Sequence, residues 1–364
     1  MTRPTHARID LAALRENFKF AGTLSPGSRT LPVVKANAYG HGAREIAEAI
    51  KDDAQAFAVA CTEEALELRA SGIEQPILIL QGAYTPDDIA LASENELWLM
   101  VGSAEQLGMV TRAQLDNPIG VWLKVDTGMH RFGIHPAQVC EYFGELRQCR
   151  SVRNDVVIAT HLSCADDLGS EFTVQQLATF RDAVAGLDAL LSMANSAGLL
   201  GWKQSHGDWN RPGYMLYGNS PFDCSHAAAD KLKPVMTLVS AVIATRRIEI
   251  GDFVGYANTW QAGRPSVIAT VAIGYADGYP RHAPNGTPVL VNGQRVPLAG
   301  RVSMDMITVD VTDLPNVKPG DEVVLWGDSL SVNEVARHAG TIGYELLAGM
   351  PRRTPRVYHH LHGD

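Results

Sequence analysis

Between residue 31 and about residue 200, short apolar runs alternate with segments that carry helix signals. Seven runs have the length of buried strands: LPVV (31–34), AFAVA (56–60), ILIL (77–80), LWLMV (97–101), GVWLKV (120–125), VVIAT (156–160) and LLSMA (190–194). One helical segment opens at Thr62 and closes at Gly72. An eighth strand is expected in the polar stretch from His206 to Asp208, where the spacing suits one. Eight such units predict an α/β fold with an N-terminal (β/α)8 TIM-type barrel.

After about residue 232 the pattern changes to strand-like runs almost throughout. These runs are VMTLVSAVIAT, DFVGYANTW, SVIATVAIGY, TPVLV, ITVDV and DEVVLW. Turn signals separate them, including Asn292-Gly293 and Pro319-Gly320-Asp321. We therefore predict a (β/α)8 barrel over residues 10–231 and a C-terminal, mainly β-strand domain over residues 232–364, with residues 1–9 as a candidate addition to the second domain.

Composition narrows the classes of partner. The 364 residues carry a formal net charge of −9 and contain no long Lys/Arg block, which argues against nucleic acid and against an anionic membrane surface. Neither a signal peptide nor a membrane span is visible, so we expect a cytoplasmic protein with a small-molecule ligand. The five cysteines are scattered and form no C-x-x-C pair, which predicts reduced thiols and no metal site.

Reactive side chains follow the predicted barrel strands at their carboxyl ends, where barrel enzymes place their chemistry. Each has an ordinary structural explanation when taken alone, but their convergence on one face predicts an active site. The residues are Lys35 after the first strand, Lys124 after the fifth, His161 after the sixth, Asn195 and Ser196 after the seventh, and Arg211 after the presumed eighth.

Lys35 lies in the segment Val-Val-Lys-Ala-Asn-Ala-Tyr-Gly-His-Gly, where an apolar strand delivers a lysine into a loop of small residues. A poorly solvated lysine loses part of its proton affinity and can form a Schiff base with an aldehyde. This segment closely resembles the pyridoxal 5′-phosphate (PLP) binding segment of the alanine racemases. The resemblance continues in order through Lys124-Val-Asp-Thr-Gly-Met-His-Arg131, Thr160-His161, Ala194-Asn195-Ser196-Ala197, Arg211-Pro-Gly-Tyr-Met-Leu-Tyr-Gly218, Gly255-Tyr-Ala-Asn-Thr-Trp260, Gly274-Tyr-Ala-Asp-Gly-Tyr279 and Gly300-Arg-Val-Ser-Met-Asp305.

The resemblance implies that Lys35 carries PLP and that Tyr39 hydrogen-bonds its phosphate. The residues themselves support a phosphate site, because Ser196 is expected to open a helix and the backbone N–H groups near Gly213 and Tyr214 can form an anion nest. Asn195 precedes Ser196 and is included in the cofactor-binding set.

By the same resemblance, Arg211 faces the pyridine nitrogen of PLP. An arginine does not give up its proton at ordinary pH, so it leaves that nitrogen unprotonated, which weakens the electron sink and limits transamination. His161 is a candidate to support Arg211 by a hydrogen bond, and a satisfied core histidine is the alternative. Some family members place a supporting histidine where this chain has Ser192.

Racemisation requires a proton to leave one face of the α-carbon and arrive at the other, so two bases are needed. The resemblance assigns the second base to Tyr275, which acts on L-alanine while Lys35 acts on D-alanine. It also implies a homodimer in which Lys35 of one subunit and Tyr275 of the other share one active site.

Arg131 and the backbone N–H of Met304 are the implied partners of the substrate carboxylate. Lys124 is often carbamylated in the family, and the alternative is an ordinary lysine paired with a nearby acid. Asp166 and Arg301 match positions at the entrance to the active site. Arg352 stands where some members have a tyrosine that contacts phosphate, which puts the selection of substrate size in question.

Two other functions compete with an alanine racemase: a PLP racemase or decarboxylase of different specificity, and a non-catalytic PLP-carrying barrel. Decarboxylation would leave the carboxylate-binding pair without a use. The β domain with its Gly-Tyr-Ala-Asp-Gly motif argues against a carrier built on the barrel alone. The residues do not distinguish a biosynthetic role, which would supply D-alanine for peptidoglycan precursors, from a catabolic one.

Overall fold

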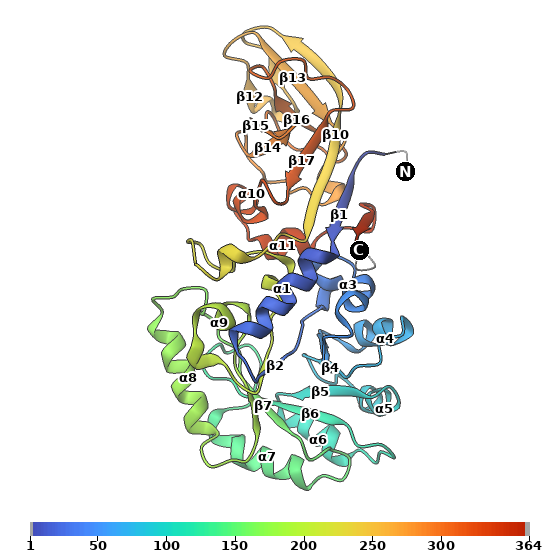
Figure 1. Ribbon diagram of the computed structural model, residues 1–364, viewed down its shortest axis with the longest axis vertical. Helices are drawn as coiled ribbons and strands as arrows, with labels where there is room; N and C mark the ends of the chain where they lie inside the picture. Colours follow the sequence, from blue (N-terminus) through green and yellow to red (C-terminus); the bar gives the residue numbers. More distant parts are fainter. Residues whose placement is uncertain (1–2, 361–364) are drawn as a thin grey trace.

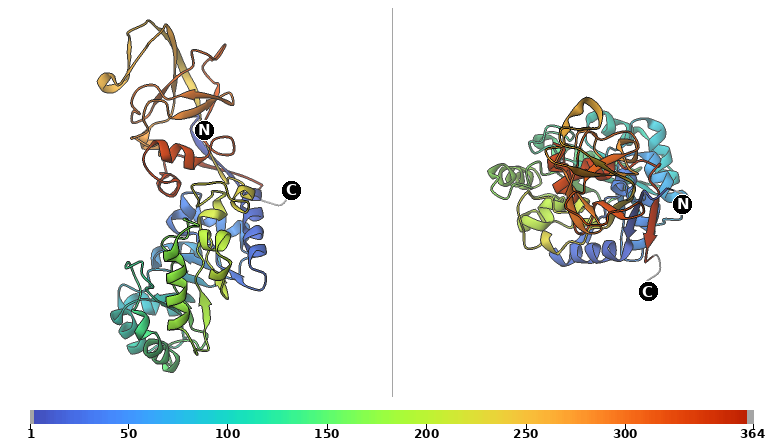
Figure 2. Two further views of the ribbon diagram at one scale, coloured as in Figure 1. Left: turned by 90° about the vertical axis from the view of Figure 1, so that its left-hand side faces the viewer. Right: turned by 90° about the horizontal axis from the view of Figure 1, so that it is seen from above.

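The computed structural model describes residues 3–360 and contains an α/β barrel and a second, mainly β-stranded part. The barrel occupies the lower half of Figure 1, with helices around its strands, and the second part stands above it. The side view in Figure 2 shows the same two parts, one above the other, in an elongated molecule.

The barrel closes through eight strand positions, which confirms the predicted fold class. Six parallel strands form the sheet order β3-β4-β5-β6-β7-β8, with bounds β3 (Phe57–Val59), β4 (Ile77–Ile79), β5 (Leu97–Val101), β6 (Gly120–Lys124), β7 (Val157–Ala159) and β8 (Leu190–Ser192). At one edge Val33 bridges to Ala58 of β3. At the other edge the Arg211 N–H donates to the Ala194 carbonyl oxygen at 2.9 Å.

The eighth strand is β9 (Trp209–Asn210), which pairs in parallel with β2 (Arg29–Thr30) and so joins the two edges. The prediction from His206 to Asp208 was therefore placed too early. The indole of Trp209 is buried against Trp98 and Trp122 at the base of the barrel. Asp208 lies just outside the strand, where its carboxylate accepts the Leu191 N–H at 2.7 Å. Aromatic packing therefore sets the position of the strand.

Helices surround the strands in the expected alternation. Their bounds are α1 (Leu11–Leu24), α3 (Ala43–Ile50), α4 (Thr62–Ala70), α5 (Pro86–Glu94), α6 (Ala104–Arg112), α7 (Val139–Gln148), α8 (Glu171–Ala183) and α9 (Ser196–Gly201). Local polar residues fix several starts: Asp10 caps α1, Ser103 caps α6 and Ser170 caps α8, each accepting a backbone N–H of the first turn. The helix predicted between Thr62 and Gly72 is confirmed as α4.

The second part is built on one long strand, β10 (Met236–Ile248), which rises from the barrel in Figure 1. It pairs antiparallel with β1 (His6–Asp10), and β1 pairs in parallel with β18 (Arg356–His359). This pairing places His6–Ile9 in the sheet of the second part. The domain boundaries at 9, 231 and 364 stay predictions, and residues 1–2 and 361–364 lie outside the described residues. The other strands are β11 (Phe253–Val254), β12 (Trp260–Gln261), β13 (Ser266–Val271), β14 (Pro288–Val291), β15 (Gln294–Pro297), β16 (Ile307–Asp310) and β17 (Glu322–Trp326).

Two short helices in this part were not predicted: α10 (Val332–His338) and α11 (Gly343–Ala348). They pack against each other, and α11 also contacts the turn that begins at Lys35. None of the helices between residues 3 and 360 combines the length and apolar character that a bilayer span requires. All five cysteines are free thiols, as the sequence predicted.

Leu123 offers a test of the barrel core, because its side chain is fully buried on β6. Leu123→Ala should lower the free energy of unfolding by about 2–5 kcal/mol through lost burial and the cavity left behind. Urea unfolding followed by circular dichroism measures this change. The matched control is Leu168→Ala, since Leu168 is 40% exposed and should cost far less. Equal losses for both variants would contradict the packed-barrel interpretation.

Candidate active site

Lys35 begins a short left-handed turn at the end of the first barrel strand. The turn, α2 (Lys35–Tyr39), has φ near +50° at every residue from Ala36 to Tyr39. Each such residue costs about 1–2 kcal/mol relative to a right-handed conformation. Specific contacts compensate: Glu64 accepts the Ala36 N–H at 2.7 Å, and Asn37 accepts the Ala43 N–H at 2.8 Å. The sequence suggested only a loop of small residues here.

Positive groups gather around Lys35 at the mouth of the barrel. Burial and the charge of Arg131 lower the pKa of Lys35, and Glu64 opposes this shift in part. Burial lowers the pKa of Lys124 to about 7, with Arg211 adding to the effect. The site thus contains amines that lose their protons readily and an electrostatic environment that favours anionic ligands.

His161 lies among these cations. Burial, followed by the charges of Arg211, Lys124, Arg131 and Lys35, lowers its pKa well below the ordinary value. The imidazole is therefore neutral at physiological pH. Between residues 3 and 360 the hydrogen-bond partners of the Arg211 guanidinium do not include the His161 ring, and support of Arg211 by His161 stays one of two open alternatives.

Arg211 is held instead by Ser192 and by backbone carbonyls. Its guanidinium donates to the Ser192 hydroxyl, to the Thr160 carbonyl oxygen, and to the Met193 carbonyl oxygen at 3.3 Å. Ser192 in turn donates to the Trp209 carbonyl oxygen at 2.7 Å. Burial lowers the pKa of Arg211 to about 10, which leaves it a cation at neutral pH. Ser192 is thus the side chain that accepts a hydrogen bond from Arg211.

A small polar pocket surrounds Gly213. The Ser196 hydroxyl accepts N–H groups from Gly213 at 3.0 Å and from Met215 at 3.3 Å. A Cβ atom on Gly213 would come within 2.7 Å of the Tyr39 hydroxyl oxygen, so only glycine permits this approach. Burial raises the pKa of Tyr39 to about 12, which keeps its hydroxyl a hydrogen-bond donor. Hydroxyl donors and a close backbone suit a phosphate group.

A cavity of about 430 Å³ opens beside this pocket. His161, Asp166, Asn195 and Tyr214 line it from the barrel side. The Asn195 side chain also caps α9, accepting the Gly198 N–H at 2.9 Å, so it fixes the start of the Ser196 helix. Four of the barrel residues predicted from the sequence therefore line one cavity, while Lys35, Arg131 and Arg211 are not among its lining residues.

Sequence reasoning missed two residues that close this cavity from the second part of the chain. The Tyr344 ring stacks on Tyr214 with centroids 3.6 Å apart, and Asn333 accepts a hydrogen bond from the Tyr214 hydroxyl. Burial raises the pKa of Tyr344, and nearby Tyr39 and Asp166 contribute to the shift. The sequence pattern predicted no helix and no motif at Tyr344, so no local signal identified it.

Three predicted site residues from the second part lie elsewhere. Tyr275 is 40% exposed and Met304 is 52% exposed, and Arg301 is also exposed. None of the three lines the cavity, and within residues 3–360 no hydrogen bond or ion pair joins their side chains to Lys35. One chain therefore does not bring Lys35 and Tyr275 into contact. Asp166, the other entrance candidate, does line the cavity.

Comparison with known proteins decides the family. A model described as the alanine racemase N-terminal domain matches residues 9–221, and one described as the alanine racemase C-terminal domain matches residues 235–358. The chain belongs to the alanine racemase family. It is a PLP-dependent enzyme, and its reaction is the interconversion of L- and D-alanine.

Three alanine racemases from other organisms illustrate the similarity of this chain to the family. The chain is 48% identical to the catabolic alanine racemase of Pseudomonas putida over 98% of its length and 99% of that protein. It matches the crystal structure of the biosynthetic alanine racemase of Pseudomonas aeruginosa with a TM-score of 0.95 and 49% identity, covering 99% and 100% of the two chains. The alanine racemase of Bartonella henselae, solved with covalently bound PLP, gives a TM-score of 0.89 at 30% identity, with 98% and 99% coverage.

The pKa of Lys124 leads to a test of carbamylation. With a pKa of about 7, much of the amine is neutral at pH 8, so Nζ can add to CO₂ and release one proton to give a carbamate anion. We expect a carbamate signal in 13C NMR after incubation with 13C-bicarbonate at pH 8, and its loss at pH 5.5, where the amine is protonated.

Lys124→Ala should abolish this signal. Lys203→Ala is the matched control. Lys203 is exposed and follows α9 in the sequence, so its substitution should leave the signal intact. A carbamate signal that persists in Lys124→Ala would contradict the assignment.

Proposed function

We propose that Lys35 and Tyr275 are the two acid/base groups of alanine racemisation and that they come from different subunits of a homodimer. Lys35 Nζ exchanges the α-proton on the face of the D-isomer, and the Tyr275 hydroxyl exchanges it on the opposite face for the L-isomer. The observation that supports this division is the placement of Tyr275: it is 40% exposed, and within residues 3–360 no hydrogen bond joins it to Lys35 of its own chain.

The barrel residues fit PLP. Tyr39, Ser196, Gly213 and Tyr214 would hold its phosphate, with Asn195 fixing the helix start beside them. PLP, when bound, supplies an electron sink that would take up the electrons of the bond between the α-carbon and its hydrogen. Arg211, which keeps its proton, would face the pyridine nitrogen.

The substrate carboxylate would bind between Arg131 and the Met304 backbone N–H of the partner chain. An anionic, carbamylated Lys124 would then hold Arg131 in place, because it would sit against an otherwise cationic group of side chains. Neutral His161 adds no further positive charge. Asp166 and Arg301 would lie at the entrance, one from each subunit.

Exposed apolar side chains of the second part support the dimer. They are Phe253, Tyr256, Met304 and Met306, all between 44% and 68% exposed in the single chain. A second copy would bury such side chains and complete both sites at once. The reduced thiols are consistent with the cytoplasm, the compartment that we propose.

Arg211 provides a test of reaction specificity. Arg211→Glu would place a group able to share a proton beside the ring nitrogen, which strengthens electron withdrawal and favours proton delivery to the cofactor carbon. We expect more pyruvate per racemisation event, measured with lactate dehydrogenase alongside the optical assay. An unchanged ratio of pyruvate to racemised alanine would remove this role for Arg211.

The shared site is tested by subunit mixing. Lys35→Ala and Tyr275→Phe should each be nearly inactive, and unfolding and refolding them together in equal amounts should restore about a quarter of wild-type activity. About half of the dimers are then mixed, and each mixed dimer has one intact site. If both bases came from one chain, mixing would restore nothing. No recovery, with mixed dimers demonstrated by mass spectrometry, would therefore refute the shared site.

A further inference from the structure

A fully buried carboxylate lies two residues after Tyr275. Asp277 ends the 3-10 turn η6 (Tyr275–Asp277), and its side chain has no exposed surface. Its Oδ2 atom accepts the Gly274 N–H at 2.9 Å, and its carbonyl oxygen accepts the Thr354 hydroxyl at 2.8 Å. The carboxylate thereby closes the turn from which the Tyr275 side chain projects.

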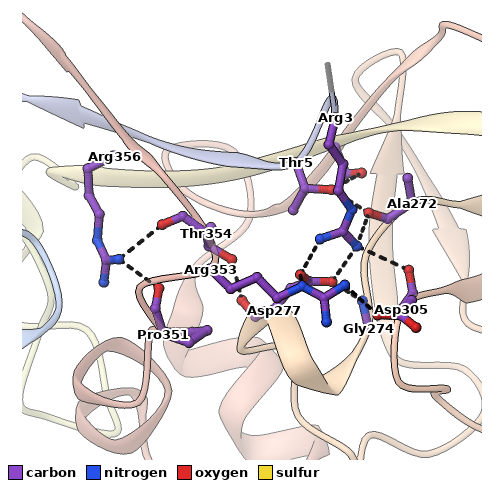
Figure 3. Close-up of polar contacts among 11 residues, drawn as sticks. Arg3, Thr5, Ala272, Gly274, Asp277, Asp305, Pro351, Arg353, Thr354 and Arg356 are labelled. Carbon is purple, nitrogen blue, oxygen red and sulfur yellow. Dashed lines mark hydrogen bonds and ion pairs between the residues drawn. The ribbon is translucent and has the colours of Figure 1, made fainter. Parts of the chain in front are cut away.

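Two arginines from opposite ends of the chain neutralise this carboxylate (Figure 3). Arg3 donates to both oxygens of Asp277, with Nη2 to Oδ2 at 2.7 Å, and Arg353 Nε lies 3.2 Å from Oδ1. Arg3 also donates to the Ala272 carbonyl oxygen at 3.0 Å. A buried charge that loses such partners is strongly destabilised, so this arrangement is sensitive to each of its members.

The same arginines extend to the segment that carries Met304. Arg353 also pairs with the Asp305 carboxylate, and Arg3 Nη2 donates to the Asp305 carbonyl oxygen at 3.3 Å. The two segments meet at the backbone as well: the Tyr275 N–H donates to the Ser303 carbonyl oxygen at 3.0 Å. One charge network therefore fixes the segments of Tyr275 and Met304 relative to each other.

Arg356 holds the segment that presents Arg353. Its guanidinium donates to the carbonyl oxygens of Pro351 at 2.7 Å and Thr354 at 2.9 Å, as Figure 3 shows. Tyr275 is 40% exposed and Met304 is 52% exposed in the single chain, so packing within their own chain fixes these side chains only in part. Their positions depend on the backbone, and the backbone depends on the network.

We propose that Asp277, clamped between Arg3 and Arg353, is a positioning residue for Tyr275 and Met304 where the second subunit completes the active site; this inference rests on the proposed two-base function. Asp277 itself touches no substrate. Its loss should displace Tyr275 while leaving Lys35, in the barrel, where it is.

Isotope exchange separates positioning from a general loss of structure. In D₂O, Lys35 alone can take the α-proton of D-alanine, exchange it with solvent and return a deuteron to the same face, whereas racemisation also needs Tyr275. Asp277→Asn in the holoenzyme should slow racemisation about 10- to 100-fold, while deuterium incorporation into D-alanine keeps about half its rate or more. The ratio of exchange to racemisation, measured by NMR and chiral chromatography, should therefore rise.

A variant that merely lowers the amount of folded enzyme reduces both rates together and leaves the ratio unchanged. Should Asp277→Asn fail to fold, Arg3→Gln serves instead, since Arg3 is about one third exposed near the chain start and Arg353 still neutralises the carboxylate. Arg353→Ala should slow racemisation, and Arg353→Lys, which keeps the positive charge, should slow it less. The matched control is Asp313→Asn, which removes the exposed Arg264–Asp313 pair of the same domain and should not change the ratio.

A second measurement needs neither cofactor nor activity. In the protein without PLP, Asp277→Asn should speed hydrogen exchange of the peptide spanning residues 274–278 about tenfold, because the Gly274 cap is weakened. Tyr275→Phe separates the two proposals: a raised exchange ratio in that variant supports the two-base function, and an unchanged ratio there refutes it. A raised ratio in Tyr275→Phe, together with unchanged ratios in Asp277→Asn and Arg3→Gln, would overturn the positioning role alone.

Discussion

The burial of positive charge at the mouth of the barrel is the constraint on which the site depends. Lys35, Lys124, Arg131 and Arg211 surround a neutral His161, and burial lowers the pKa of the two lysines and of Arg211. Taking a cation out of water is costly unless other groups replace the lost solvation. For Arg211 the Ser192 hydroxyl and two carbonyl oxygens do so. A phosphate and a substrate carboxylate would balance the remaining charge, which links the fold to its ligands.

Four consecutive residues with a costly left-handed backbone, Ala36 to Tyr39, lie at the same place. The left-handed turn after Lys35 needs the carboxylate of Glu64 on α4 and the side chain of Asn37 to hold it. The pocket around Gly213 needs the absence of a side chain beneath the Tyr39 hydroxyl. These features persist because the rigid barrel surrounds them, and they place reactive groups with little freedom to move.

The second part of the chain does more than cover the barrel. Through α10 and α11 it supplies Asn333 and Tyr344, which fix Tyr214 at the cavity that we propose to be next to the PLP site of the same chain. Its sheet incorporates β1 and β18, so the first and last strands of the described residues lie side by side. Arg356 of β18 also donates to the Gly40 carbonyl oxygen at 2.9 Å, next to the Lys35 turn. The segments of both proposed bases are thus tied to one strand, although in the proposed dimer they would serve different sites.

By itself, the sequence determined the barrel, the strand-rich second part and the set of reactive residues at the barrel mouth. The periodicity of apolar residues along the chain shows which segments are buried strands, and the sequence also shows which residues follow each strand. Both features can be found within a short stretch of sequence. The sequence did not determine the exact place of β9, the helices α10 and α11, the partner of Arg211 or the roles of Tyr344 and Asp277. Ser192, Tyr344 and Asp277 acquire their contacts from residues 19 to 274 positions away. Only the tertiary structure decided these, because a hydrogen bond or a ring contact depends on which distant segments the packed core brings within a few ångströms.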